Sequence, residues 1–514
     1  MKTIMNETPK NNRGWQILRR FLIGVAIFAT LIAIFYTEED WRGKRAWENC
    51  KREFEARGET LDWNAYIPPT VPDDQNIFAA PKMQDWFVKN SQATTNEFYG
   101  RLRNVDTTAT NLNEAAAARF LAWSDQFEPD FDLIREALKR PYARTNGDYS
   151  MPYEQPIPNF VNVRILAQTL AQRAKCDLLL GQPDKALQEL TLMHDMHRLL
   201  EAATTGKPMT LVAAMVNVAV TGLYVDTIAS GLKPHAWQES QLVALQEQLK
   251  GISLLPIVAA TFKIERVALF DAYATHPAKL ADLYKFADVL IYDGASSSDK
   301  TKAGAFWWRL TNPMYLFLKL APRGWSYQNM VNCAEIVSKY TDDSLDGFDL
   351  EHDTISPRIF DESTHNLNQF HNHESPFKLL AAIATAQFPN FTKASQLLAY
   401  NQTLVNEAQV VCALERYHLA HGEYPETLDA LVPQFIEKLP HDLIGGPPSQ
   451  GSGAASQPLH YRRMDPPSQS FGAASGKFLL YSIGWNETDD GGQDSPQTKN
   501  GGMDYAKGDW VWKN

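Results

Sequence analysis

The sequence predicts a mainly helical protein with a single N-terminal transmembrane helix and a smaller α+β domain at its C-terminal end. Three observations lead to this prediction. A run of 16 uncharged residues, Phe21 to Tyr36, stands near the N-terminus. Apolar residues recur at helical spacing over much of 110–280, and two strand-like segments follow a last long helix. A chain of 514 residues is long enough for about two to four domains.

The uncharged run has the features of a membrane anchor. It is slightly shorter than the roughly 20 residues that cross a bilayer core, but Arg19 and Arg20 can snorkel back to the headgroups. A cleaved signal peptide would end in a small-x-small site, whereas this run ends in Ala33-Ile34-Phe35-Tyr36 and is soon followed by three acidic residues. The sequence therefore predicts an uncleaved signal anchor at 21–37, after a basic tail at 1–20.

The charges on either side of the run predict its orientation. Five basic residues and one acidic residue precede it, and three acidic residues follow Thr37. Basic flanks remain on the cytoplasmic side of a membrane. We therefore expect a single-pass membrane protein with a cytoplasmic N-terminus, which contacts the membrane through 21–37 and has the bulk of its chain on the extracytoplasmic side.

Charge and cysteine content exclude several classes of protein. The 49 basic and 60 acidic residues give a net charge of −11, which argues against nucleic acid as a partner because phosphate binding needs a basic surface. The four cysteines lie far apart and include no Cys-x-x-Cys pair, so they predict neither a zinc site nor a disulfide scaffold. Buried free thiols are the favoured interpretation, with one long-range disulfide as the alternative.

The segment 38–109 is expected to connect the anchor to a globular body. Trp47, Cys50 and Phe54 share one face of a charged helix that stops at Gly58 and continues the anchor outward. Four prolines between 62 and 81 then block helix formation. We expect this second part to form an extended strap over the body.

Residues 110–393 are expected to form an irregular helical domain. Its best-defined unit is a pair of helices, Val161 to Leu180 and Lys185 to Leu200. Gly181 would cap the first helix in the left-handed conformation, and Asp184 would cap the second. The pair resembles one tetratricopeptide-type hairpin, but no second copy follows at a fixed period, so a regular solenoid is not expected.

Two further segments of this domain raise the question of membrane contact. Thr210 to Leu232 is strongly apolar, but Asn217 and Asp226 interrupt it, and a charge inside a membrane span is costly. This segment is expected to be a buried central helix. The aromatic segment from Ala305 to Trp325 fits either an interfacial helix on the bilayer or, as the favoured alternative, part of a protein core.

The C-terminal domain is expected at 394–514. A helix from about Ala394 to Leu419 stops at Gly422, and strand-like segments follow at 459–463 and 477–484. The stretches 445–457 and 465–476 share a repeated sequence rich in proline, serine, glycine and alanine. Such a composition cannot build a core, so both are expected to be exposed loops.

Six short motifs of this domain occur in the order found in the type II secretion major pseudopilin, and the last stretch of about 110 residues resembles the globular part of that protein. The motifs are Ala413-Leu414-Glu415-Arg416-Tyr417, Gly422-Glu423-Tyr424-Pro425, Leu428-Asp429-Ala430-Leu431, Leu439-Pro440-His441-Asp442, Tyr481-Ser482-Ile483-Gly484 and Asp509-Trp510-Val511-Trp512. The resemblance implies a long helix packed on a small antiparallel sheet. The family's processed Gly-Phe-x-x-x-Glu site does not precede the apolar run, so filament assembly is not expected.

The pseudopilin resemblance also implies a calcium site in the acidic, glycine-rich segment that begins at Asn486. Its candidate ligands are Asp489, Asp490, Asp494 and Asp504. Calcium prefers oxygen ligands on a flexible loop, and the alternative is a solvated acidic turn. The whole chain also resembles a family of membrane-anchored exported proteins that share the stretch Gly43-Lys44-Arg45-Ala46-Trp47-Glu48, a resemblance that implies no activity.

Two groups of histidines and carboxylates are weaker candidates for a metal site. His194 and His197 are one helical turn apart, but no glutamate occupies the general-base position of a zincin motif. The second group lies at 351–374, and its residues have no defined metal-ligand spacing. It consists of Glu351, His352, Asp353, Asp361, Glu362, His365, His371, His373 and Glu374.

Three functions remain open at this stage. The favoured one is a non-enzymatic, membrane-anchored envelope protein that acts as an interaction scaffold for a protein partner. The second is a metal-dependent envelope hydrolase that uses 351–374. The third is a component associated with a secretion system. No nucleophile motif, Walker loop or dinucleotide fingerprint is present in the sequence, so no catalytic residue is assigned.

Overall fold

The protein is mostly helical and divides into two compact units. Unit 1 comprises Met1–Leu61, Ala272–Ile336 and Phe370–Gln387, and unit 2 comprises Asp62–Asp271, Val337–Gln369 and Phe388–Asn514. The computed structural model describes residues 13–59, 62–88, 113–150, 152, 155–200, 209–275, 313–371, 388–444, 457–464, 477–498 and 501–513. The expected loops at 445–457 and 465–476 therefore lie outside the described residues, except for Gln457.

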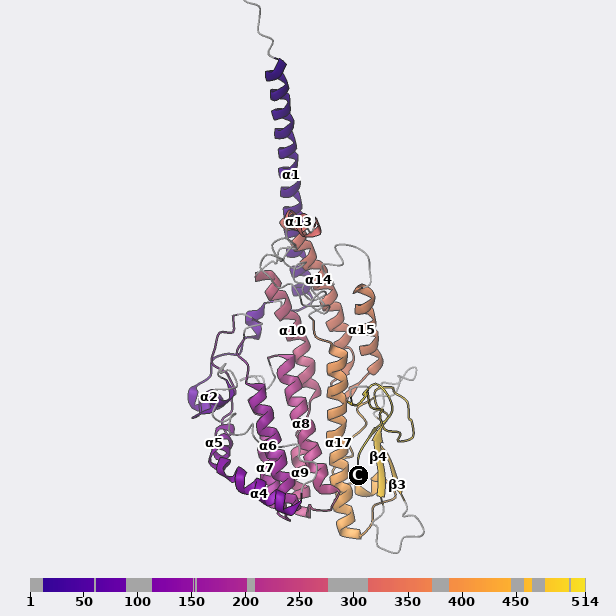
Figure 1. The fold of residues 1–514 in the computed structure, drawn as a ribbon. Coiled ribbons are helices and arrows are strands. Elements are labelled where there is room, and N and C mark those ends of the chain that lie inside the picture. Colours follow the sequence, from indigo (N-terminus) through magenta and orange to yellow (C-terminus); the bar gives the residue numbers. More distant parts are fainter. Residues whose placement is uncertain are drawn as a thin grey trace, which may run out of the picture. The chain divides into compact units, whose positions relative to one another are not determined.

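Unit 1 is built on a long N-terminal helix, α1 (Arg13–Ala56), which is drawn in indigo in Figure 1. Its 44 residues include both the apolar run and the charged segment behind it, so the expected continuation of the anchor helix is confirmed. Trp47, Cys50 and Phe54 are all buried on its second half. Gly58 follows the helix with a φ of +79°, a conformation that glycine adopts without strain.

Two glycines allow α1 to pack closely on the start of α14 (Arg323–Leu345). A Cβ atom on Gly43 would lie 2.1 Å from the carbonyl oxygen of Gly324, and one on Gly324 would lie 1.8 Å from the carbonyl oxygen of Glu39. The amide of Gly324 donates to the Asp40 carboxylate at 2.8 Å, and Trp325 Nε1 donates to the Glu39 carboxylate at 3.0 Å. Because only glycine lacks a Cβ atom, this helix contact requires both glycines.

Unit 2 contains a bundle of helices, of which α6, α8 and α17 lie side by side (Figure 1). Its helices, some of which begin or end in the sequence of unit 1, are α2 (Met83–Phe87), α4 (Glu114–Ser124), α5 (Glu128–Leu138), α6 (Phe160–Leu179), α7 (Pro183–Asp195), α8 (Leu211–Leu232), α9 (Glu239–Lys250), α10 (Leu255–Thr275), α15 (Pro357–His371) and α17 (Phe391–His421). Short 3-10 helices η1 (Trp63–Tyr66), η2 (Asp73–Gln75), η3 (Ile77–Ala79), η4 (Asp125–Phe127), η5 (Met196–Leu199) and η6 (Leu428–Leu431) connect them.

The expected helix pair is present as α6 and α7, which contact each other across a short turn. Gly181 has a φ of +69°, as expected for a left-handed cap. The predicted cap at Asp184 is wrong. Pro183 occupies the first helical position, where its fixed φ is favourable, so the cap residue is Gln182, and Asp184 instead accepts a hydrogen bond from Gln241 Nε2 at 2.5 Å.

A buried arginine links this helix pair to the preceding helices. Arg173 on α6 donates from Nε to Glu189 on α7 at 2.6 Å, and from its other nitrogens to Asp125 and Glu128 at 3.1 Å each. It also donates to the hydroxyl of Ser124 at 2.7 Å. The Arg173 side chain is only 7% exposed, so these acceptors together compensate for the loss of its hydration.

Helix α8 lies at the centre of unit 2, in contact with α6, α7 and α17. It is one of two described helices long and apolar enough to cross a membrane, but 61% of its apolar window is buried inside the protein. Val218 and Ile228 have no exposed surface. The expectation of a buried central helix in place of a second membrane span is confirmed.

A small sheet lies beside α17 (Figure 1). Its strands are β3 (His460–Met464), β4 (Lys477–Ser482) and β5 (Trp510–Val511), and they pair antiparallel in the order β3-β4-β5. Arg462 is opposite Leu479, and Ser482 is opposite Trp510. Both expected strands are present, and α17 ends as expected at Gly422, which has a φ of +78°. A second pair of very short strands, β1 (Phe348–Asp349) and β2 (Thr354–Ile355), lies before α15.

Candidate functional site

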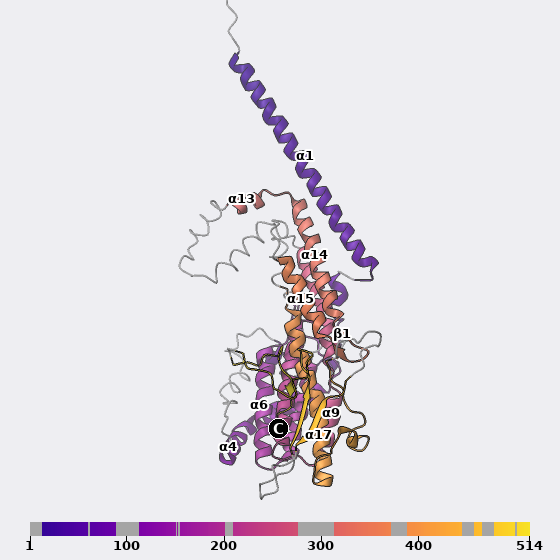
Figure 2. The ribbon, with the colours of Figure 1, turned by 90° about the vertical axis from the view of Figure 1, so that its right-hand side faces the viewer.

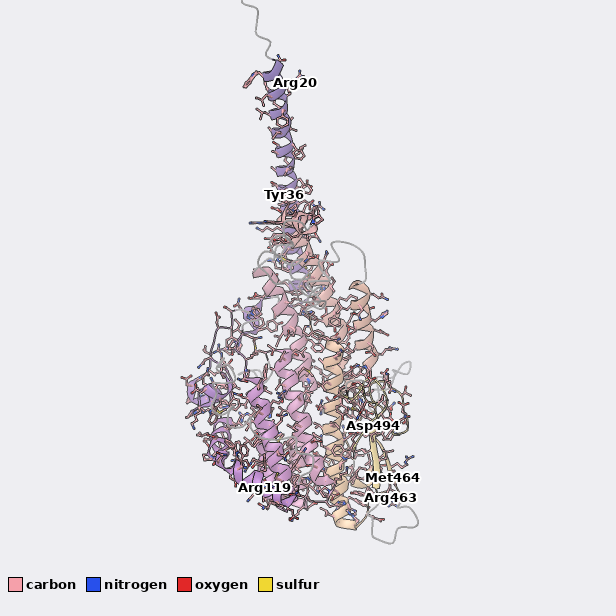
Figure 3. All side chains as sticks on the ribbon, viewed as in Figure 1. Arg20, Tyr36, Arg119, Arg463, Met464 and Asp494 are labelled. Atoms are coloured by element: carbon pink, nitrogen blue, oxygen red, sulfur yellow. The ribbon has the colours of Figure 1, made fainter. Side chains whose placement is uncertain are left out.

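The four candidate calcium ligands lie on the loops after β4, and each carboxylate contacts another protein group. Asp489 accepts hydrogen bonds from the Tyr481 hydroxyl at 3.0 Å and from the Gly491 amide at 2.8 Å, and the Gly491 amide lowers the pKa of Asp489. The other three have separate partners: Asn486 Nδ2 donates to Asp490 at 2.9 Å, Lys513 pairs with Asp494 at 3.1 Å, and Lys507 pairs with Asp504 at 3.0 Å. Figure 3 labels Asp494.

The described structure does not gather these four carboxylates into one coordination sphere. Within the ranges that the structure describes, no group of three or more histidine, cysteine, aspartate and glutamate side chains is placed to hold a metal ion. Calcium takes about six to eight oxygen ligands, which this arrangement does not supply. Calcium binding by the loop therefore stays a prediction, and no step of the proposed function depends on it.

A fifth aspartate, Asp509, organises the acidic segment, whereas in the sequence it stands out only as part of the motif Asp509-Trp510-Val511-Trp512. The carboxylate of Asp509 is fully buried and accepts hydrogen bonds from the amides of Asp490 at 3.1 Å and Gly492 at 2.6 Å. Burial raises the pKa of Asp509. The position of Asp509 directly before the aromatic residue Trp510 was a signal in the sequence that Asp509 is buried, because a polar residue beside a buried aromatic residue is itself often buried.

The polar segment at 351–374 forms separate local pairs. His352 Nδ1 lies 2.8 Å from the Asp349 carboxylate, which raises the pKa of His352. Trp485 Nε1 donates to Asp361 at 3.3 Å. The side chain of His371, and all of His373 and Glu374, lie outside the described residues. The described members of this segment are thus not grouped around a common point, and the proposed metal-dependent activity stays untested.

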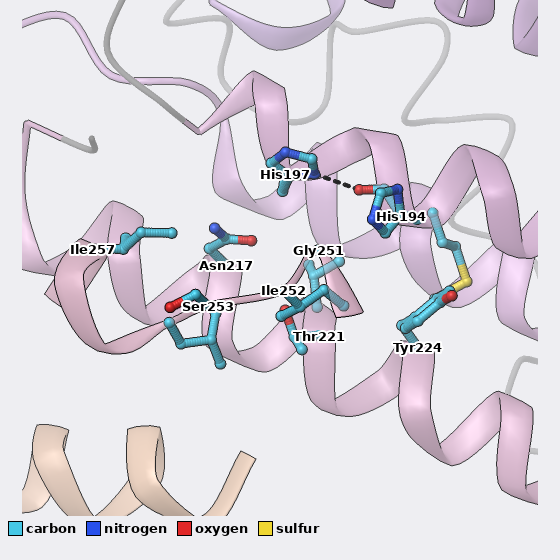
Figure 4. A pocket seen from close by; sticks show the side chains of 12 residues that line it. His194, His197, Asn217, Thr221, Tyr224, Gly251, Ile252, Ser253 and Ile257 are labelled. Atoms are coloured by element: carbon cyan, nitrogen blue, oxygen red, sulfur yellow. Dashed lines mark hydrogen bonds between the residues drawn. The ribbon is translucent and has the colours of Figure 1, made fainter. Parts of the chain in front are cut away.

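The histidines of the other candidate group line a cavity of about 130 Å³ in unit 2. His194 comes from α7 and His197 from η5, while residues 251–257 close another side (Figure 4). The facing helix, α8, contributes Asn217, Thr221 and Tyr224. Both apolar and polar groups line this cavity, which is large enough for a small ligand or ordered water.

The electrostatics of this cavity favour a neutral imidazole at His197. Burial lowers the pKa of His197, whose Nδ1 lies 2.5 Å from the carbonyl oxygen of His194. The Nδ1 atom of His194 lies 3.1 Å from the carboxylate of Asp195, and the two ring centroids are 5.5 Å apart. The hydroxyl of Tyr224 donates to Gln248 Oε1 at 2.7 Å. A neutral imidazole can donate a hydrogen bond to a polar ligand or accept one from it. The cavity is therefore suited to an uncharged polar molecule or water.

The polar face of α8 was visible in the sequence, but its role was not recognised. Asn217 and Thr221 are four residues apart, and Tyr224 follows three residues later. This spacing places all three on one face of a helix. In the sequence, Asn217 served only as an argument against a membrane span. The cavity also requires residues 251–257, and no local sequence pattern shows that these residues lie beside α8.

The apolar run of α1 is exposed, and its last residue, Tyr36, donates a hydrogen bond to the carbonyl oxygen of Leu320. None of its apolar window is buried inside the protein, and Phe21, Phe28 and Leu31 are each about 60% exposed. Arg20 and Tyr36 mark the two ends of the run (Figure 3). At about 1.5 Å per residue, the run is about 24 Å long. An exposed apolar helix of this kind is typical of a membrane anchor or a signal sequence.

Comparisons with protein-family models, with curated proteins and with solved structures find no match to this chain.

Proposed function

We propose that this protein is a non-enzymatic interaction scaffold, anchored in a membrane by 21–37 and carrying most of its chain on the extracytoplasmic side. One observation carries the proposal. Helix α1 has a first half that is apolar and exposed and a second half that is packed on α14, without a break between them. A cleavage that removed the first half would leave the packed half with a new end inside a helix. This continuity favours an anchor over a cleaved signal sequence.

Two resemblances support a scaffold role for the remainder of the chain. The α6–α7 pair resembles a tetratricopeptide-type hairpin, a unit whose repeats build binding surfaces. The segment from α17 to β5 resembles the globular part of the type II secretion major pseudopilin, which also connects this proposal to a secretion-associated role. Among the described residues, β3 pairs only with β4, so its other edge is available for a partner strand.

The orientation is tested with single introduced cysteines, because the four native cysteines are buried and unpaired. Gly14→Cys places a thiol on the N-terminal side of the apolar run, and Lys513→Cys places one near the C-terminus. A membrane-impermeant maleimide is expected to label Lys513→Cys in intact cells and Gly14→Cys only after lysis. The opposite labelling pattern, or a mature chain that starts near residue 37, would overturn the anchor and its orientation.

The scaffold role is tested by a photo-crosslinking residue on the free edge of the sheet. Met464 and Arg462 on β3 are exposed (Figure 3 labels Met464). A crosslinker at Met464 is expected to capture one discrete protein in whole cells, and the matched control at the exposed Arg164 on α6 is expected to capture none. Identical patterns at both positions, or no adduct at Met464, would contradict this binding surface.

The hydrolase alternative is tested by elemental analysis of purified protein. The scaffold proposal expects no stoichiometric zinc, iron or manganese. About one such ion per chain would overturn the proposal in favour of metal-dependent chemistry at 351–374. Capture of secretion machinery by the Met464 crosslinker would instead identify the third candidate, a component associated with a secretion system.

A further inference from the structure

We propose that α13 (Pro313–Lys319) and the next residue, Leu320, rest on the same membrane that α1 crosses. The surface consists of Leu316, Phe317 and Leu320, and we refer to it as the α13 patch. This inference rests on the proposed anchoring of α1 and adds a second membrane contact, made by a segment almost 300 residues further along the chain. The α13 patch is apolar and exposed, and we propose that lipid contacts it.

The α13 patch is an apolar surface on a helix that already has a buried side. Tyr315 and Leu318 are 9% and 7% exposed and pack inside the protein. Leu316, Phe317 and Leu320 are 39%, 56% and 70% exposed. The helix is thus apolar on both sides, and one of these sides is exposed. An exposed apolar cluster of this kind marks a binding surface.

Hydrogen bonds place the α13 patch at the end of the apolar run. The hydroxyl of Tyr36 donates to the carbonyl oxygen of Leu320. Tyr36 is the last residue of the run, so Leu320 lies at the level where the run meets the charged part of α1. The two contacts from Gly324 and Trp325 to Asp40 and Glu39 fix the next residues of the chain against the following turn of α1. In Figure 2, α13 lies at the height of the lower half of α1, where α14 begins.

The residues around the α13 patch have the composition of a membrane interface. Phe317 and Trp325 have ring centroids 5.8 Å apart, and Tyr36 and the exposed Trp41 lie on the adjacent part of α1. Tyrosine and tryptophan concentrate where a bilayer meets water. Lys319 and Arg323 are exposed beside the patch, where their long side chains can reach lipid headgroups. Apolar, aromatic and basic residues thus occur together in the arrangement that an interfacial helix requires.

Site-directed fluorescence on the full chain tests this contact. Phe317→Cys and Leu320→Cys replace exposed residues, and the native cysteines are buried, so an environment-sensitive dye can be attached at either position. Glu335→Cys, an exposed position further along α14, is the matched control, and Ile27→Cys in the apolar run reports on α1 itself. The chain is placed in vesicles of phosphatidylethanolamine and phosphatidylglycerol, with or without a nitroxide high on the acyl chain.

The expected result is a blue-shifted emission at positions 317 and 320, with loss of intensity in nitroxide vesicles, and no change at position 335. If Ile27→Cys is quenched but positions 317 and 320 behave like position 335, the lipid contact is overturned while the anchor stands. If Ile27→Cys is not quenched, the proposed anchoring fails first. A disulfide between two Phe317→Cys chains, without quenching, would assign the patch to a second copy of the protein and also overturn the lipid contact.

Discussion

The apolar run of α1 and helix α8 have similar compositions and opposite environments. Their most apolar windows have mean hydropathies of 2.2 and 1.7, and both are long enough to cross a bilayer. None of the α1 window is buried inside the protein, whereas 61% of the α8 window is. Hydropathy alone therefore does not predict which of these two apolar helices is buried inside the protein.

The difference lies in polar residues and in neighbouring helices. Asn217 and Thr227 of α8 are buried, and Thr227 donates its hydroxyl hydrogen bond to the carbonyl oxygen of Leu223 at 2.8 Å. Helices α6 and α17 cover α8 from two sides. The run in α1 has neither buried polar side chains nor covering helices among the described residues. Whether each apolar helix is buried thus depends on its contacts with segments that are distant in the sequence. Hydropathy contains no information about these contacts.

The largest expected effect comes from placing a carboxylate in each helix. Val218→Asp puts an unpaired charge at a position with no exposed surface, and we expect it to cost more than about 4 kcal/mol of folding free energy. Ile27→Asp should leave the melting of unit 2 unchanged and weaken membrane insertion by about 3 kcal/mol. Circular dichroism melts and vesicle flotation measure the two effects. Equal melting temperatures for Val218→Asp and Ile27→Asp would contradict the different environments of α8 and the apolar run.

The next effect concerns the helices that cover α8. Arg173→Ala removes the donor that Glu189, Asp125 and Glu128 share. Breaking a buried ion pair costs about 3–5 kcal/mol, because the buried Glu189 is then left with only the longer contact to Arg135, at 3.9 Å. The measurement is urea denaturation followed by tryptophan fluorescence. Arg164→Ala, an exposed arginine on the same helix, is the control and should change stability by no more than about 0.5 kcal/mol.

A smaller effect is expected where α1 packs on α14. Gly43→Ala inserts a Cβ atom 2.1 Å from the carbonyl oxygen of Gly324, and such overpacking costs about 1–3 kcal/mol. The buried thiols of Cys50 and Cys333 report on this region, and their rate of maleimide labelling should rise about tenfold, since about 1.4 kcal/mol corresponds to a factor of ten.

The control for this experiment is Gly24→Ala, because nothing lies within 4 Å of a Cβ atom at Gly24. Its labelling rates should match those of the natural protein. Cys176 and Cys412, which belong to unit 2, should also label at unchanged rates. Faster labelling of all four thiols would indicate global unfolding and contradict a local role for the two glycines.

The smallest expected effect is a pH dependence from α17. Among the residues that the structure describes, neither carboxylate oxygen of Glu407 has a hydrogen-bond partner, and burial raises the pKa of Glu407 well above its usual value. Asp442, itself buried, raises it further. Because the folded pKa exceeds the unfolded pKa, the folded state is penalised as pH rises above about 4.3, and each unit of the shift costs about 1.4 kcal/mol.

Glu407→Gln should therefore stabilise the protein at neutral and alkaline pH, by at least about 1 kcal/mol, and have little effect near about pH 4. Urea midpoints across this pH range measure the difference. Glu247→Gln, at an exposed position on α9, should show no such trend. A constant difference between Glu407→Gln and the natural protein at all pH values would mean that Glu407 does not titrate as proposed.

The helices and their ends followed well from the sequence, because local patterns determine them. The stops at Gly181 and Gly422, the buried face of Trp47, Cys50 and Phe54, and the two strands β3 and β4 all depend on residues that are close to one another in the sequence. Asp184 failed as a cap because the adjacent Pro183 already begins the helix. A one-residue change in the start of a helix is enough to change the partner of a side chain.

The contacts between distant segments could not be predicted in the same way. Gly43 and Gly324 are unremarkable as isolated glycines, and only the helix contact explains both. The four candidate calcium ligands follow β4 in the sequence, but Lys513, Lys507 and Tyr481 engage three of their carboxylates. Composition indicates which residues prefer a cation, whereas the arrangement of neighbours decides which partner each carboxylate has.

The unbroken course of α1 has a mechanical consequence. From Tyr36 to Phe54 the helix extends about 27 Å at about 1.5 Å per residue, with no proline in between and no break at Gly43. A tether of flexible residues would let the two ends reorient independently. A continuous helix instead transmits tilt and rotation, so any change in the orientation of the apolar run is conveyed directly to the residues around Trp47 and Phe54.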